Sequence, residues 1–272
     1  MLHGLDVQLP RDIREAVRQQ IALTFQPPYE APITVAVNGA LMSSAWFFLP
    51  TTLRDKLFTV HGTLAFALVL AAWMYSDVPA TNVLGPDAVR SHAALDDPVM
   101  LRRLLLAKST VLWLLVTPVC VLVALISGLA NHSLLSTWYT IVMIGVFPFG
   151  FLAISAWVGI VFPYHPMPLR YRWEHRKPRK RMLVRWAVLV VTPYVVVPLL
   201  GVLLMVPSLL VWGFTAPHGL TQKLPDGDFG VGVVVACAVT LACALGGHRM
   251  STWIAGKRQA RLLEFLGDPV RG

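Results

Sequence analysis

The stretch that decides the fold runs from Ser109 to Leu169, STVLWLLVTPVCVLVALISGLANHSLLSTWYTIVMIGVFPFGFLAISAWVGIVFPYHPMPL, and contains no Asp, Glu, Lys or Arg. A helix needs about 20 apolar residues to cross a hydrocarbon layer that is roughly 30 Å thick. This stretch is therefore long enough for two crossings. The polar patch at 127–133, SGLANHS, is the expected turn between them.

Four other charge-free stretches flank this one, at 31–53, 57–76, 186–222 and 229–248. The first, second and last are each long enough for a single crossing. Within the longest we expect one helix from about Met182 to Met205, followed by an apolar segment at 207–219 that dips into the outer leaflet and returns. The sequence thus predicts an all-α polytopic membrane protein with six transmembrane helices and an outer re-entrant segment between helices five and six. Seven crossings is the main alternative, and it would reverse the side of the C-terminus.

The composition agrees with a membrane protein. Hydrophobic residues make up 56% of the chain and charged residues 14%, whereas about a quarter of a soluble domain is charged. This deficit excludes a disordered chain and argues against a water-soluble globule. The nine Trp and twelve Phe can anchor the chain at both membrane interfaces.

The basic residues predict the orientation. With the N-terminus inside, the inner pieces 1–31, 77–108, 164–185 and 248–272 hold 20 of the 23 Lys and Arg residues. Because Lys and Arg concentrate on the cytoplasmic side, both termini are predicted to be cytoplasmic and the chain to lie in the plasma membrane. The net charge of +9 is then explained by anchoring at anionic lipids, and no nucleic-acid partner is expected.

The N-terminal piece predicts an amphipathic helix at the membrane interface. Its apolar residues recur every four positions at Ile13, Val17, Ile21 and Phe25. Pro10 fits the first turn of such a helix, and Pro27-Pro28 ends it. The domains expected are a cytoplasmic N-terminus with this helix (1–31), a six-helix transmembrane domain (32–248) and a cytoplasmic tail (249–272).

A second helix start lies inside the second inner loop. Asp96 or Asp97 can act as the N-cap and Pro98 as the first helical residue. The segment from Met100 to Lys108 then leads into the membrane.

Residues for catalysis are missing from the predicted crossings. No Asp or Glu lies within any of them, which argues against ion-coupled transport because such transport usually relies on these side chains. Intramembrane proteolysis is not expected either, since paired aspartates, a Ser/His pair and a His-Glu zinc motif are all missing. Lys108-Ser109-Thr110 matches the end of a phosphate-binding loop, but no glycine precedes it within 102–107. A haem held by His61 and His132 is disfavoured. We expect no catalytic residue, metal site or cofactor in this chain.

Three segments carry a family resemblance: TNVLGPD at 81–87, DPVMLRRLLLAK at 97–108, and SAWVGIVFPY at 155–164. Together with six crossings and an interfacial helix before the first, they resemble ABC-2-type transporter permeases. The chain departs from that family in a very basic loop at 164–181, and it has no second half like that of the longer permeases.

The resemblance implies a permease that dimerises, as a homodimer or a heterodimer, and docks separate ATP-binding cassette subunits that carry ATP and Mg. The interfacial helix and the 97–108 segment would contact those subunits. The coupling candidates are Arg14, Glu15, Arg18, Asp97, Arg102, Arg103 and Lys108. An uncharged pathway suits export of an amphiphilic substrate such as a drug, antibiotic or lipid, and its lining candidates in the first crossing are Asn38, Ser43, Ser44, Trp46 and Phe47.

Two other functions stay open from the residues alone. One is a membrane scaffold that assembles or anchors partner proteins without transport. The other is an enzyme acting on lipid, which would require Asp77, Asp87, Asp96 and Asp97 to hold a divalent metal. Their irregular spacing argues against this enzyme.

Overall fold

The computed structural model describes residues 9–27, 29–52, 63–76, 78–130, 132, 134–165, 226–267 and isolated positions between 184 and 210. Every regular element within these residues is a helix, so the predicted all-α fold is confirmed for the described part of the chain. The predicted helix at 182–205 lies mostly outside the described residues. So does the predicted re-entrant segment at 207–219.

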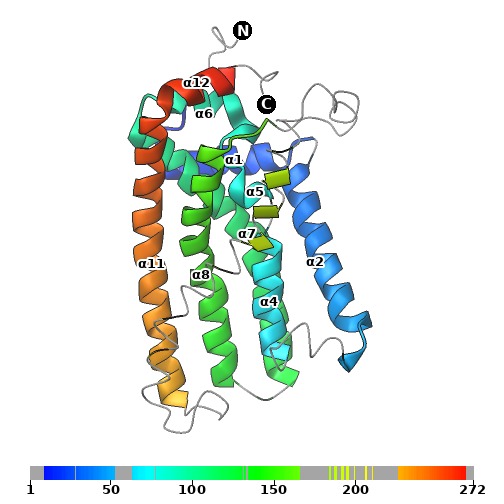
Figure 1. Ribbon diagram of the computed structural model, residues 1–272. Helices are drawn as coiled ribbons and strands as arrows, with labels where there is room; N and C mark the ends of the chain where they lie inside the picture. Colours follow the sequence, from blue (N-terminus) through cyan, green and yellow to red (C-terminus); the bar gives the residue numbers. More distant parts are fainter. Residues whose placement is uncertain are drawn as a thin grey trace.

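Four helices are long and apolar enough to cross a membrane: α2 (Glu30–Phe48), α7 (Pro98–Ala130), α8 (Leu134–Val161) and α11 (Asp226–Lys257). A fifth apolar helix, α4 (Thr63–Tyr75), is shorter. Figure 1 shows these helices standing side by side. The protein is therefore a multi-pass membrane protein.

The turn predicted at 127–133 is confirmed. Helix α7 continues to Ala130 and α8 begins at Leu134, and His132 between them has a positive φ of 49°. The two helices approach closely at this end, because a Cβ added to Gly128 would lie 1.8 Å from the Thr137 hydroxyl oxygen. A larger residue at position 128 would therefore force the Thr137 side chain to move.

The core between the upright helices is formed by α4, α7 and α8. Tyr75 at the end of α4 is completely buried, and its hydroxyl lies 2.7 Å from the Thr117 hydroxyl on α7. Its ring packs edge-on against Phe151 of α8 at a centroid distance of 5.2 Å. These contacts join three helices in one apolar cluster with Val116 and Cys120.

The predicted amphipathic helix is α1 (Ile13–Thr24), and Figure 1 shows it lying across the upright helices near one end. Asp12 is its N-cap and accepts a hydrogen bond from the Glu15 backbone at 2.8 Å, while the Glu15 carboxylate accepts one from the Arg11 backbone at 2.7 Å. The prediction that Pro10 occupies the first turn was wrong. The side-chain cap at Asp12 starts the helix later, and Pro10 precedes it.

The predicted start of α7 is confirmed, with Asp97 as the cap. The Asp97 carboxylate accepts a hydrogen bond from the Val99 backbone at 2.8 Å, and Pro98 is the first helical residue. Asp96, the other candidate, instead accepts a hydrogen bond from the Gln259 side chain at 2.6 Å.

Residues 249–272, for which the sequence predicts only a tail, contain the last turns of α11 and a further helix, α12 (Gln259–Gly267). Leu262, Phe265 and Leu266 of α12 are buried. They pack in a second apolar cluster with Leu84, Leu95 and Leu101 from distant parts of the chain. The closely spaced apolar residues at 262–266 are the signal that could have indicated this helix.

We predict that Gly159→Ala lowers the midpoint of thermal unfolding in detergent. Alanine favours a helix by about 1 kcal/mol over glycine, but a Cβ at position 159 would lie 1.9 Å from the Thr81 carbonyl oxygen. Fitting an extra methyl group into such a close contact typically lowers the free energy of unfolding by about 1–3 kcal/mol.

The matched control is Gly256→Ala, since a Cβ at that helical position has nothing within 4 Å. It should unfold at the same or a higher temperature than the original chain. Equal midpoints for the two variants would contradict the close approach of α8 to Thr81.

Candidate functional site

The candidate site is a layer of short segments at one end of the upright helices, which we call the end layer. It comprises α1, the segment 78–95, the first turns of α7 to Lys108, the segment 162–165 after α8, and α12. The segment 78–95 contains α5 (Val78–Thr81), η1 (Gly85–Asp87) and α6 (Ala88–Ala94). Figure 1 shows α1, α5, α6 and α12 together at this end.

Two of the three segments that carry the family resemblance meet in the end layer. The Asn82 side-chain amide donates a hydrogen bond to the Tyr164 carbonyl oxygen at 3.0 Å, across 82 positions of sequence. The backbone at Gly85 comes so close that an added Cβ would lie 1.6 Å from the same carbonyl oxygen. Asn82 is buried, so its side-chain amide needs a partner, and this contact supplies one.

The third segment reaches the same place through Lys108. Its ammonium group donates a hydrogen bond to the Val83 carbonyl oxygen, one residue from Asn82. A coupling role was predicted for Lys108. In the structure its charged end lies inside the end layer and holds Val83 against α7.

The C-terminal part of the chain is tied to the same helix ends. His165 stacks on the Phe265 ring at a centroid distance of 4.9 Å, and its Nε2 lies 2.9 Å from the Phe265 carbonyl oxygen. Arg258 donates a hydrogen bond to the Val161 carbonyl oxygen at 2.9 Å. Since the last carbonyls of a helix have no partner within it, Arg258 completes the end of α8.

The other coupling candidates divide into buried and exposed groups. Arg103 donates a hydrogen bond to the Pro10 carbonyl oxygen at 2.8 Å and so holds α1 against α7. The Nε of Arg102 is buried and has no hydrogen-bond partner among the described residues. Arg14, Arg18 and Asp97 are exposed.

The apolar stripe of α1 points away from the rest of the described chain. Ile13, Ile21 and Phe25 are 43%, 37% and 54% exposed, whereas Ala16 on another face is buried. Ala16 thus marks the buried face of α1, and Ile13, Ile21 and Phe25 are left for lipid or a partner.

The pathway candidates of α2 are not brought to one face. Asn38 is buried and accepts a hydrogen bond from the Tyr194 hydroxyl at 3.3 Å, and Trp46 packs on Phe66 at a centroid distance of 4.7 Å. Ser43 is half-buried and Ser44 is exposed, while Phe47 is 73% exposed.

A pair of buried polar side chains beneath the end layer was missed by sequence reasoning. His248 of α11 and Ser155 of α8 are 2% and 0% exposed. Neither ring nitrogen of His248 nor the Ser155 hydroxyl has a hydrogen-bond partner among the described residues. The sequence indicated only that His248 belongs near the inner face, because burial by a neighbouring helix has no local signal.

The carboxylates that a metal-dependent enzyme would need are used separately. Asp87 lies 3.8 Å from Arg90, Asp96 accepts from Gln259, and Asp97 caps α7, while Asp77 is outside the described residues. In the described part of the chain, no three His, Cys, Asp or Glu side chains come close enough to hold a metal ion.

Comparison with family models, curated proteins and solved structures finds no match for this chain.

Replacing Asn82 with Asp should destabilise the end layer. The substitution keeps the shape but removes the donor, and it places a carboxylate against the Tyr164 carbonyl oxygen in a buried position. Leaving such buried groups unpaired costs about 1–3 kcal/mol, and more when one is charged. Thermal unfolding in detergent would measure the loss.

Asp96→Asn is the control for this variant, because position 96 is exposed and an amide oxygen still accepts from Gln259. It should unfold like the original chain. An Asn82→Asp protein with an unchanged midpoint would show that the contact with Tyr164 does not support the fold.

Proposed function

We propose that this chain is the transmembrane permease subunit of an ATP-binding cassette exporter, with the end layer on the cytoplasmic side. The single observation that carries the proposal is the convergence of the three permease-like segments. Asn82, Val83, Lys108 and Tyr164 come from all three and are joined by two hydrogen bonds. Segments that act together in coupling would need such mutual contact.

The direction of the described helices supports six crossings over seven. Figure 1 shows α1 and α12, the first and last described helices, at the same end of the upright helices. Helix α8 ends at that same end, and α11 begins at the opposite end. This arrangement agrees with the single crossing that the sequence predicts between them, which gives six in total.

The end layer can transmit force from a partner to the membrane helices. Its short helices are tied to the ends of α7, α8 and α11 by hydrogen bonds from Lys108, Asn82 and Arg258. A rigid body of this kind moves helix ends together when a docked subunit changes shape. ATP and Mg would be bound and hydrolysed on that subunit, and this chain would contribute positioning alone.

The exposed residues of α1 are the part of the end layer that best fits a docking surface. Arg14 and Arg18 are exposed and can pair with carboxylates on an ATPase subunit. Arg103, by contrast, is held by the Pro10 carbonyl oxygen and positions α1 on α7.

The composition of the membrane helices supports the proposed substrate class. None of the four described spans contains an Asp or Glu residue. An amphiphilic or hydrophobic molecule could pass such surfaces without leaving a charge unpaired. A second permease chain could pack on α2, whose residues Ile33, Val37, Leu41 and Phe48 form an exposed apolar row.

The test is to coexpress this chain with a candidate cassette ATPase, purify the complex in mild detergent, and measure ATP hydrolysis that depends on the chain. Reversing the charges with Arg14→Glu and Arg18→Glu should lower both recovery of the ATPase and chain-dependent hydrolysis. Loss of two charged contacts corresponds to roughly tenfold or more in affinity.

The matched control is the pair Arg14→Lys and Arg18→Lys, which keeps the charge and should retain most of the complex. Equal recovery with the charge-reversed and the original chain would refute docking through α1. If no cassette ATPase gives chain-dependent hydrolysis, the scaffold function replaces the exporter.

A further inference from the structure

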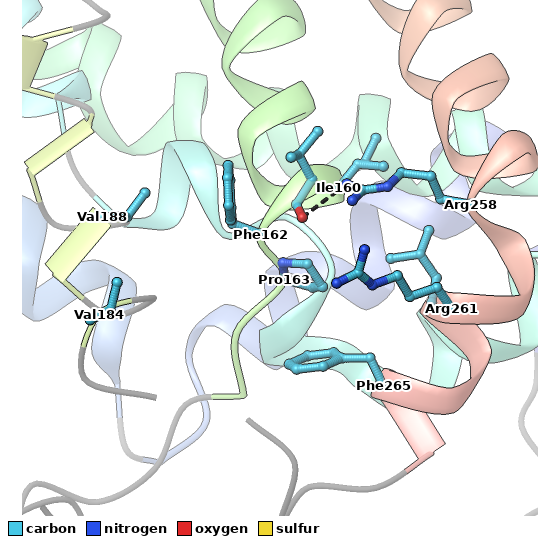
Figure 2. A pocket seen from close by; sticks show the side chains of 10 residues that line it. Ile160, Phe162, Pro163, Val184, Val188, Arg258, Arg261 and Phe265 are labelled. Carbon is cyan, nitrogen blue, oxygen red and sulfur yellow. Dashed lines mark hydrogen bonds between the residues drawn. The ribbon is translucent and has the colours of Figure 1, made fainter. Parts of the chain in front are cut away.

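A cavity of about 500 Å³ lies where α8 and α11 end. Figure 2 shows Arg258 and Arg261 extending from the α11–α12 side toward Phe162 and Pro163, with Val184 and Val188 on the opposite side. The described residues that line it are Ile160, Val161, Phe162, Pro163, Val184, Val188, Arg258, Arg261, Leu262 and Phe265. The cavity thus combines two guanidinium groups with an otherwise apolar wall.

Two candidate membrane helices end beside the cavity. Helix α8 ends at Val161 and α11 ends at Lys257. The hydrogen bond from Arg258 to the Val161 carbonyl oxygen, at 2.9 Å, joins the two ends. Trp253, one turn before the end of α11, is 54% exposed and packs under the Lys257 ammonium at 3.9 Å, an arrangement typical of a membrane interface.

Positive charge in the cavity is not neutralised by the described chain. Arg261 is exposed and has no hydrogen bond or ion pair to another described residue. Arg258 uses one N–H on Val161, and a guanidinium has five. No carboxylate is among the described residues that line the cavity.

From this geometry we propose that the cavity binds an anionic phospholipid of the leaflet next to the end layer. Its phosphate is held by Arg261 and by the remaining donors of Arg258, because guanidinium groups bind phosphate oxygens in a bidentate manner. Its acyl chains lie along the apolar side formed by Phe162, Val184 and Val188. Among the described lining residues no carboxylate can pair with the ammonium of a zwitterionic headgroup, which favours a net negative lipid.

A lipid bound here would link the end of α8 to α12. Arg258 already joins these two parts, and Leu262 and Phe265 belong both to the cavity and to the apolar cluster of the end layer. The end layer should therefore be more stable in a bilayer that contains anionic lipid. The proposal of this lipid site does not depend on the proposed exporter function.

The experiment is native mass spectrometry of the full chain purified in detergent and supplied with phosphatidylglycerol or phosphatidylcholine. The original chain should retain phosphatidylglycerol in preference to phosphatidylcholine. Arg261→Gln should lower retention of phosphatidylglycerol about tenfold, the usual effect of one lost charge-assisted contact. Arg249→Gln is the matched control, because Arg249 is an exposed arginine of α11 that does not line the cavity.

The thermal unfolding midpoint is the second measurement. It tests whether the variants still fold and whether the bound phosphate belongs to a lipid or is free. Phosphatidylglycerol should raise the thermal midpoint of the original chain and of Arg249→Gln, and should not raise that of Arg261→Gln. Inorganic phosphate should neither raise the midpoint nor displace the lipid, since it cannot fill the apolar wall.

Three results would overturn the proposal. The first is equal retention by the original chain and Arg261→Gln, and the second is equal retention of the two lipids. The third is displacement by inorganic phosphate or by an acidic protein segment, which would identify a general anion site or a protein contact.

Discussion

The rest of this structure depends on how the backbone carbonyl groups at the end of a membrane helix find hydrogen-bond partners. The last carbonyl groups of a helix have no partner within it, and leaving them unpaired near lipid is costly. Arg258 satisfies the Val161 carbonyl oxygen at the end of α8. Two further side chains bond carbonyl groups of the loops beside it: Asn82 bonds that of Tyr164, and Lys108 bonds that of Val83. These three hydrogen bonds bring the end layer together.

The same interactions explain why the end layer can act as one body. Its donors lie on a loop, on α7 and at the junction of α11 with α12, and they connect these parts to one another and to the end of α8. The close approaches at Gly85 and Gly159, where no side chain fits, restrict the backbone further. A docked ATPase and a bound lipid would both act on this body, one from the solvent side and one from the membrane edge.

The sequence predicts the parts of this fold that depend on local chemistry. The long stretch without charged residues predicted the two helices α7 and α8, and the Asp97-Pro98 pair predicted where α7 begins. It did not predict α12, the inward use of Lys108, or the burial of His248, because these depend on contacts between segments far apart in the chain. The sequence predicted the apolar stripe of α1 but not that Ile13 and Phe25 are exposed. An apolar stripe alone does not show whether it packs against protein or faces lipid.

The central claim is that the end layer is one cooperative body, and hydrogen–deuterium exchange of the full chain in lipid nanodiscs tests it most directly. Amides of a single cooperative unit open together and share one opening free energy. Amides in the 82–95 segment and in α12 should therefore show the same protection, and Asn82→Asp should lower it in both. Fast exchange of α12 beside a protected α6, or a loss confined to one segment in that variant, would contradict the account.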